Sequence, residues 1–588
     1  MSSKTIVMYE ISQKQRFIFR TNRLLENIGA SHIIRMLTAN PRKLFKNGMF
    51  QKEADKPLDL SEPRYRIVGG GNAAFIFDSE SEATVFSRNL SFNVLRYFPG
   101  IELFLVKRTV EWEKEPLYQN GDLPGVMNEM RNELANKKNE RRYAVKQESW
   151  GIQKACVTSG LPANKEIKDE DTDEVQPRAA EFDLIQMIGK DMRNDEYSKR
   201  FIEENELLPE HHNYRFFKQE DMEKVFGKDS PGSDGKSYLT IVSIDGNAMG
   251  VKVAKFFEQT FSNKGDFIHK YQNFTDKIDN AYTQAFRKTI CNVMETYDVW
   301  APDFYGDEEH DTWKKVIPIR PIIASGDDIS FMTYGKLGIE IAKTFLQNLQ
   351  KQTISIGEAD SQNTYHFEAC AGVAIIRHRY PFWLGFQLAD ELCSNAKKRL
   401  KQDEEKWAEH GMKGSNGLPY DTSLIDWHVV SHSDMVEDIA SYRERIYKNK
   451  DGSLLSMRPY YVQNETALKK HFASYEDAFK RVALKALKRT EANEKTDRDN
   501  DKIPSMAKWK NLRDIYTEGE RSVHQWQILN QFFPSGEPDK QDDLFYRYED
   551  GFGLLNDPQD ENGQAFATYF DAIEIFDYFT DLSGRDKG

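Results

Sequence analysis

Three aspartates stand where carboxylates could hold a divalent cation. Asp245 ends the apolar run TIVSID, and Asp327 and Asp328 follow Ser325-Gly326 in the tetrapeptide SGDD. The apolar residues before Asp245 predict a buried strand whose carboxyl end brings out the aspartate. Mg²⁺ prefers oxygen ligands and keeps phosphate oxygens in its shell, and a pair of ions can activate a hydroxyl and stabilise a leaving pyrophosphate. The acids therefore indicate phosphate chemistry with Mg²⁺ or Mn²⁺, two ions per site.

The residues after Asp245 favour an anion beside the metal. Gly246 follows the aspartate directly, and Gly250 lies just inside a predicted helix. This order brings backbone N–H groups and a helix N-terminus close to the acid, as a phosphate site needs. The alternative is a set of solvated turn acids, since Gly-Asp turns are common and SGDD alone is a short match. Asp245 and the matching layout of the elements around it favour the metal site.

The elements that must position these acids follow one plan twice. Each copy runs strand, helix, hairpin, helix, strand, with apolar residues at the matching spacing. We predict the first copy as a strand at 4–20, a helix at 21–39, a hairpin at 64–79, a helix at 81–97 and a strand at 101–110. We predict the second as a strand at 237–250, helices at 249–262 and 267–297, a hairpin at 319–334, a helix at 336–351, a strand at 369–376 and a helix at 381–400.

Aligning the two hairpins gives the first copy a different chemistry. Gly69-Gly70-Gly71-Asn72 falls opposite SGDD, and Glu10 or Ser12 falls opposite Asp245. Glycine has no side chain and asparagine is neutral, so we expect the first hairpin not to hold a divalent ion with carboxylates. The domain boundaries that follow are 1–115 for the first copy, 116–236 for a helical middle region and linker, 237–410 for the second copy, and 411–588 for a mixed and then helical region.

The composition excludes several classes of protein. Aromatic residues make up 12% of the chain, which argues against global disorder. A net charge of −13 excludes a protein whose whole surface binds nucleic acid or membrane. The four cysteines are scattered singly, so we expect neither a disulfide framework nor zinc. Because we find no signal peptide and no apolar run long enough to span a bilayer, we expect a cytoplasmic protein without membrane contact.

Several further motifs occur in a fixed order. They are QKQRFIF at 13–19 with GAS at 29–31, GGGN at 69–72, SIDGNAMG at 243–250, SGDD at 325–328, RHRYPFWLGFQLADELCSNAKK at 377–398, SLIDWHVV at 423–430 and RPYYV at 458–462. Together they resemble the large palm-domain subunit of type III CRISPR effector complexes, the cyclic-oligoadenylate synthetase family. The joint order is far more specific than any one motif.

The resemblance implies an α/β (α+β) fold with two ferredoxin-like palm domains, each an antiparallel sheet with helices on one face, plus helical middle and C-terminal domains. The first palm would be degenerate and the second catalytic. The implied reaction is ATP nucleotidyl transfer, in which a ribose hydroxyl of one ATP attacks the α-phosphate of another and pyrophosphate leaves. The product would be a cyclic or linear oligonucleotide second messenger in antiviral defence.

The resemblance also implies roles for single residues. Asp245 and Asp328 would be the main metal carboxylates, with Asp327 beside them and the carbonyl of Gly246 or Ile244 completing the shell. The backbone N–H groups of Asn247, Ala248, Met249 and Gly250 would meet a triphosphate beside Ser325 and Gly326. Lys397 would neutralise phosphate charge, although a solvated lysine in a KKR cluster is an equal alternative. A second nucleotide would touch Ser31 and the turn with Gly70, Gly71 and Asn72, whose glycines a tight hairpin also requires.

The chain departs from the family in ways that change the expected partners. It begins inside the first palm, without the HD nuclease domain that many members carry, so we expect no intrinsic DNase activity. Ser325 replaces the first glycine of the family's GGDD, but the acids remain. The expected partner is ATP, with guide RNA and other type III effector subunits left open. The alternatives are a cyclic mononucleotide, a dinucleotide or an adenylated small molecule made at the same site, or a non-enzymatic scaffold subunit.

Overall fold

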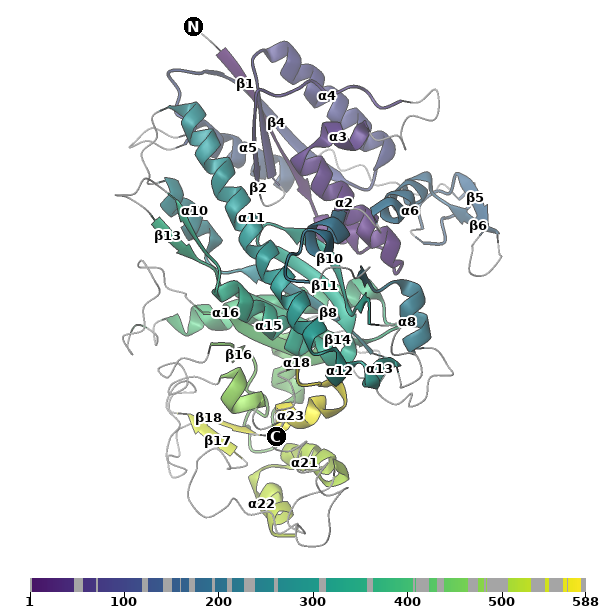
Figure 1. Cartoon of the computed structure of the whole chain (residues 1–588), viewed down its shortest axis with the longest axis vertical. Coiled ribbons are helices and arrows are strands. Elements are labelled where there is room, and N and C mark those ends of the chain that lie inside the picture. Colours follow the sequence, from purple (N-terminus) through teal and green to yellow (C-terminus); the bar gives the residue numbers. More distant parts are fainter. Residues whose placement is uncertain are drawn as a thin grey trace. The chain divides into compact units, whose positions relative to one another are not determined.

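The structure is a computed structural model of the whole chain (Figure 1). The residues it describes are 3–46, 56–69, 72–118, 125–140, 151–158, 160–168, 175–192, 196–208, 214–226, 238–257, 263–305, 314–356, 363–404, 408, 422–430, 438–463, 474–480, 483, 506–529, 545–548, 564–567 and 569–582.

The chain folds into two compact units, each built from separate stretches of sequence. The first unit comprises Met1–Glu204, Phe257–Asn280 and Ile322–Asp327. The second comprises Asn205–Phe256, Ala281–Pro321 and Asp328–Gly588. Both mix helices with sheets, which confirms the predicted mixed α/β class.

The first unit is built on a four-stranded antiparallel sheet with the order β2-β3-β1-β4. Its strands are β1 (Ser3–Ser12), β2 (Tyr65–Gly69), β3 (Asn72–Phe77) and β4 (Glu102–Glu111). The central strand β1 is buried from residue 5 to residue 9, because side chains on both of its faces are covered. The helices α2 (Leu24–Ala39), α4 (Glu80–Tyr97) and α5 (Val126–Glu140) pack against the sheet.

The first predicted strand is too long. It was expected over 4–20, but the strand ends at Ser12, and α1 (Lys14–Ile18) follows. Gln13 has a φ of 50°, a left-handed conformation that breaks the extended chain at that point. Phe17 and Ile18 are buried on the short helix, so the apolar residues that suggested a strand are still used in the core.

The second unit contains most of a six-stranded mixed sheet with the order β10-β11-β8-β14-β15-β16, in which the end of β10 is assigned to the first unit. Its strands are β8 (Tyr238–Gly246), β10 (Ile319–Ser325), β11 (Asp328–Tyr334), β14 (Ala369–Arg377), β15 (Leu424–Val429) and β16 (Tyr460–Tyr461). The first four strands repeat the spatial order of the smaller sheet, with β8 in the place of β1. The addition is β15, which pairs in parallel with β14.

Helices of the second unit cover this sheet. The helices α15 (Gly338–Gln350) and α16 (Phe382–Gln402) pack on β14 and β8, and α10 (Met249–Phe257) begins just after β8. The approach of α16 to β14 is very close at Gly372, where an added Cβ would lie 1.9 Å from the carbonyl oxygen of Ala389. Only glycine fits between the two elements at this point.

The remaining elements of the first unit are short. They are α3 (Pro41–Phe45), β5 (Lys165–Lys168), β6 (Val175–Arg178), α6 (Ala180–Met192), α7 (Glu196–Ser198) and the π-helical turn η2 (Lys199–Glu203). The long helix α11 (Lys264–Glu295) contributes residues to both units.

The second unit also contains smaller elements. They are β7 (Arg215–Phe216), α8 (Gln219–Phe226), α12 (Tyr297–Trp300), α13 (Pro302–Tyr305), β9 (Val316–Ile317), η3 (Gly335–Leu337), β12 (Thr353–Ile356), β13 (Asn363–His366), α18 (Ile439–Ile446), η5 (Tyr475–Lys480), α21 (Met506–Glu518), α22 (Glu520–Leu529), β17 (Phe545–Tyr548), β18 (Gln564–Ala567), α23 (Phe570–Ile575) and η8 (Phe576–Tyr578). The two-stranded pairs β5-β6 and β17-β18 were not anticipated from sequence.

None of the helices in the described ranges is both long and apolar enough to cross a bilayer.

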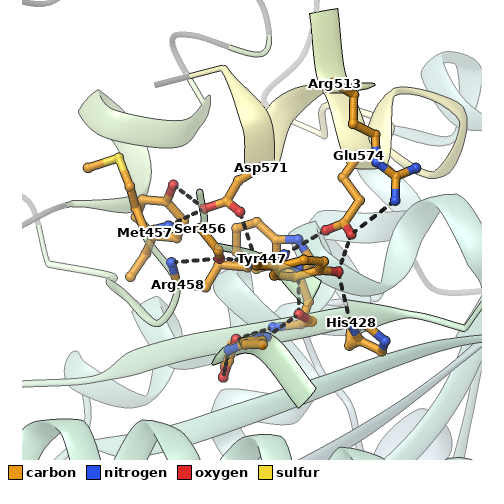
Figure 2. Close-up of polar contacts among 12 residues, drawn as sticks. His428, Tyr447, Ser456, Met457, Arg458, Arg513, Asp571 and Glu574 are labelled. Atoms are coloured by element: carbon orange, nitrogen blue, oxygen red, sulfur yellow. Dashed lines mark hydrogen bonds and ion pairs between the residues drawn. The ribbon is translucent and has the colours of Figure 1, made fainter. Parts of the chain in front are cut away.

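A buried polar network ties α23 to the region around β15 (Figure 2). The Arg458 guanidinium is fully buried and forms ion pairs with Asp571 at 3.0 Å and Glu574 at 2.6 Å. Tyr447 donates to Glu574, and its hydroxyl lies 3.4 Å from Nδ1 of His428. Burial alone would raise the pKa of Glu574, but Arg458, with smaller contributions from His428, Arg513 and Tyr447, lowers that pKa to about 2. The helix α23 is therefore attached to the region of β15 and β16 by buried ion pairs and by the hydrogen bond from Tyr460 to Asp571.

Candidate active site

The register of two neighbouring strands brings two of the predicted acids together. In the antiparallel pairing of β11 with β8, Asp328 lies directly opposite Asp245. Residues directly opposite in such a pair have Cβ atoms about 5 Å apart, so both carboxylates can reach one cation. Asp245 keeps half of its side-chain surface exposed, and Asp328 is also partly exposed. Two like charges at this spacing repel each other unless a positive charge lies between or beside them.

Lys397 on α16 supplies such a charge. Its ammonium donates to Oδ2 of Asp245 at 2.5 Å and to the carbonyl oxygen of Gly246 at 2.9 Å. Burial would lower the pKa of Lys397, but the charge and hydrogen bond of Asp245, with smaller contributions from Cys393 and Cys370, raise it. The lysine therefore stays charged at neutral pH. Of the two predicted alternatives, a solvated lysine does not describe this contact, although phosphate binding itself stays a prediction.

The segment after Asp245 forms a tight turn into α10. The backbone N–H of Asn247 donates to the carbonyl oxygen of Glu368 at 2.8 Å, and Ala248 has a φ of 53°. The first N–H groups of any α-helix have no intrahelical acceptor, so the start of α10 offers donors close to Asp245. A Cβ on Gly250 would meet no atom within 4 Å, which leaves open space there. Met249 lies at the first position of this helix.

Asp279 and Arg200 hold the backbone of Ala324 and Gly326 at the hairpin turn, and these four residues all belong to the first unit. Gly326 has a φ of 62°, which explains the glycine in the turn. Its N–H donates to Oδ1 of Asp279 at 3.0 Å, and Oδ2 of Asp279 accepts from Arg200 at 2.7 Å. Arg200 also donates to the carbonyl oxygen of Ala324 at 3.1 Å. Ser325 is exposed and Asp327 is partly exposed, so the turn presents its polar side chains outward.

The smaller sheet contains a counterpart of the Asp245 constellation. Glu10 on β1 lies opposite Asn72 on β3, as Asp245 lies opposite Asp328. Of the two predicted candidates, Glu10 and not Ser12 is therefore the equivalent of Asp245. Lys138 on α5 donates to Oε1 of Glu10 at 2.6 Å, as Lys397 does to Asp245. The counterpart therefore has one carboxylate where the second sheet has two.

Of the other residues predicted to bind a nucleotide in the first copy, the structure describes Ser31 and Asn72. Ser31 is buried on α2 with 5% of its surface exposed. Asn72 is exposed at the start of β3, whereas Gly70 and Gly71 lie outside the described residues. The expected second nucleotide at these positions stays a prediction.

The donor set at Asp245 and Asp328 fits a hard cation that arrives with its substrate. Two carboxylates and the Gly246 carbonyl are oxygen donors of the kind Mg²⁺ takes. Among the described residues, no three His, Cys, Asp or Glu side chains converge to hold a metal ion by themselves. Because Mg²⁺ is commonly bound by one or two carboxylates together with substrate phosphates, this set fits an ion carried by a nucleotide.

Sequence reasoning missed the residues that support the site. Arg200 and Asp279 hold the hairpin turn, and Lys252 and Glu368 hold the turn after Asp245. These residues are far apart in sequence and have no motif spacing. One sequence feature could have indicated a buried lysine: Lys252 lies between two valines in a predicted helix.

No family model matches the chain, and no curated protein matches its sequence. Solved structures do resemble it. A Csm1–Csm4 cassette in complex with cA4 is 11% identical with a TM-score of 0.39, covering 89% of this chain and 67% of that chain. The apo Csm1–Csm4 cassette is 12% identical with a TM-score of 0.41, covering 98% and 70%. The apo type III-B Cmr-beta complex is 11% identical with a TM-score of 0.39, covering 98% and 81%. The chain is thus similar in structure, at low identity, to chains of Csm1–Csm4 cassettes and of a type III-B Cmr-beta complex.

Proposed function

We propose that this chain is a metal-dependent nucleotidyltransferase that joins ATP molecules into a cyclic or linear oligonucleotide second messenger. The observation that carries the proposal is the register that sets Asp245 opposite Asp328, with Lys397 bound to Asp245. The connectivity supports it, because strand, helix, two strands, helix, strand with the order β2-β3-β1-β4 is the ferredoxin-like arrangement of palm domains. The second sheet repeats this order around the acids.

The residues of the chain would divide the work of the reaction. Mg²⁺ or Mn²⁺ held by Asp245, Asp328 and the Gly246 carbonyl would neutralise charge on the phosphates and lower the pKa of an attacking hydroxyl. The N–H groups at the start of α10 would bind and orient the triphosphate, and Gly250 would leave room for it. Lys397 would add positive charge beside the leaving pyrophosphate. These groups would hold the ribose hydroxyl of one nucleotide in line with the α-phosphate of another.

We infer the biological setting from the sequence motifs. They favour a subunit that acts in antiviral defence, with guide RNA and other type III effector subunits as partners. A cyclic mononucleotide, a dinucleotide or an adenylated small molecule would come from the same site with another acceptor.

The decisive experiment is to incubate the chain with ATP and Mg²⁺ and identify the products by mass spectrometry. Asp245→Asn and Asp328→Asn keep the side-chain size but remove a metal ligand, so we expect each to reduce turnover more than about 100-fold. Folding of both variants is checked by urea unfolding, because each removes repulsion between two facing carboxylates but Asp245→Asn also removes the ion pair with Lys397.

The matched control is Asp438→Asn, because Asp438 is an exposed N-cap of α18 and asparagine caps equally well. It should keep wild-type turnover. Product formation that survives in both site variants would contradict the assignment. RNA that copurifies with a chain unable to turn over ATP would instead favour a scaffold subunit.

A further inference from the structure

A lysine and a glutamate outside the proposed chemistry form a buried ion pair next to the site. Lys252 lies on the first turn of α10 with 1% of its side chain exposed, and Glu368 precedes β14 with 5% exposed. Their nitrogen and oxygen are 3.1 Å apart. Burying two charges costs several kcal/mol per ion before their attraction is counted, so such a pair is weak evidence for stability alone.

Both partners also bind the backbone of the same residue. The Lys252 ammonium donates to the carbonyl oxygen of Asn247 at 2.9 Å. The carbonyl oxygen of Glu368 accepts from the N–H of Asn247 at 2.8 Å. The Asn247 side chain donates to the carbonyl oxygen of Thr422 at 2.9 Å. Asn247 is thus held on three sides, at its N–H, its carbonyl and its side chain.

The held residue lies between the acid and the helix that would bind phosphate. Asp245 is two residues before Asn247, and the left-handed Ala248 follows. A left-handed conformation costs a non-glycine residue about 1–2 kcal/mol, so the surrounding contacts must impose it. The N–H of Lys252 donates to the carbonyl oxygen of Ala248 at 3.0 Å, which ties the turn to the start of α10.

We propose that Lys252 and Glu368 are positioning residues that fix the turn at Asn247 and Ala248. They aim the Asp245 carboxylate and the first N–H groups of α10 at the same ligand. The proposal rests on the proposed function for the identity of that ligand, a nucleoside triphosphate. It makes nucleotide affinity depend on two buried side chains that do not touch the nucleotide.

The test compares two buried lysines. Lys252→Met should weaken binding of a non-hydrolysable ATP analogue by about 10-fold or more, the effect expected for a residue that orients a ligand group. The matched control is Lys480→Met. Lys480 is 4% exposed and pairs with the buried Glu340 at 2.9 Å, but it makes no contact with the turn. This control should lose stability without losing analogue affinity.

A double variant separates positioning from stability. Lys252→Met with Glu368→Leu removes both charges, and replacing a whole buried pair by apolar residues often restores stability. We expect stability in urea to recover while analogue affinity stays low, because Asn247 still lacks the donor to its carbonyl. If affinity recovers together with stability, the pair serves the fold alone and the proposal is wrong.

Hydrogen exchange gives a readout that needs no nucleotide. The amides of Asn247, Val251 and Lys252, which donate to Glu368 and Ala248, should exchange faster in Lys252→Met than in the wild type, with position 252 then a methionine amide, and at the wild-type rate in Lys480→Met. Unchanged exchange in Lys252→Met would overturn the positioning role whatever the chain binds. Faster exchange in a chain that binds no ATP analogue would keep the positioning role and overturn the proposed function.

Discussion

At the scale of single residues, charge explains the arrangement of the site. Asp245 and Asp328 face each other across two strands, and Lys397 neutralises one of them. The same lysine–acid contact occurs at Glu10, where the facing residue is the neutral Asn72. The second sheet therefore has two facing carboxylates at this position, and the first sheet has one.

Gly250 allows one prediction about stability and another about nucleotide affinity. Its exposed position in α10 leaves room for a Cβ, and alanine is favoured over glycine in a helix by about 1 kcal/mol. Gly250→Ala should therefore raise the midpoint of urea unfolding. If a triphosphate uses this space, Gly250→Val should also weaken binding of the ATP analogue several-fold.

The control for Gly250 is Gly385→Ala on α16, where the new Cβ meets the flexible ends of Ile376 and Ile241. It should leave analogue affinity unchanged. Unaltered affinity in Gly250→Val would show that no ligand approaches the start of α10.

The candidate acids could be predicted from sequence, whereas their support could not. Asp245 lies at the end of an apolar run and Asp328 lies in a glycine-containing turn, and both patterns can be recognised from neighbouring residues alone. Lys252 and Glu368 meet only after β8 and β14 have paired, so no local pattern reports their contact. Burial also hides them, because a lysine in a sequence normally indicates an exposed position.

At the scale of elements, periodicity predicted the repeated plan well. The helices predicted at 21–39, 81–97 and 336–351 are observed as α2, α4 and α15 within a few residues. The sequence did not predict that β15 adds in parallel to β14, because strand pairing depends on where the chain returns and not on composition. It also did not predict that β1 ends before Gln13, because a left-handed backbone conformation is uncommon for glutamine.

The contact of α16 with β14 gives a prediction at this scale. In Gly372→Ala, the new Cβ would lie 1.9 Å from the Ala389 carbonyl oxygen and 2.3 Å from the Cys393 nitrogen. Both are backbone atoms, so α16 must move away from the sheet, with a cost of about 1–3 kcal/mol. Lys397 lies one turn further along this helix and should lose its contact with Asp245.

We therefore expect Gly372→Ala to lower both stability in urea and ATP turnover per folded molecule. Gly385→Ala serves again as control, because its Cβ meets the movable side-chain ends of Ile376 and Ile241. Wild-type stability in Gly372→Ala would mean that α16 does not pack at this distance.

At the scale of the whole molecule, the polar network around Arg458 makes folding sensitive to acid (Figure 2). His428 is 3% exposed, and burial lowers its pKa from 6.5 to about 3, although Glu574 partly opposes this. The histidine is therefore neutral in the folded chain. In the unfolded chain it takes up a proton below about pH 6.5, so acid favours unfolding between that pH and about 3.

This window predicts the effect of replacing the histidine. The wild type should lose stability by about 1.4 kcal/mol per pH unit more than His428→Gln as pH falls through the window. Urea unfolding at several pH values measures both slopes. His269→Gln, on an exposed position of α11, should keep the wild-type slope. Equal slopes in wild type and His428→Gln would show that His428 is protonated in the folded chain.

The repeated sheet has a genetic consequence. In a homodimer, one gene encodes both halves, so a substitution in one site appears in the other. Here the two sheets belong to a single chain, and their equivalent positions mutate independently. Asn72 can stand where the other copy has Asp328 without any change to the acid pair at Asp245. A single chain with two copies of one fold can therefore hold two different sites, which a symmetric dimer of one copy cannot.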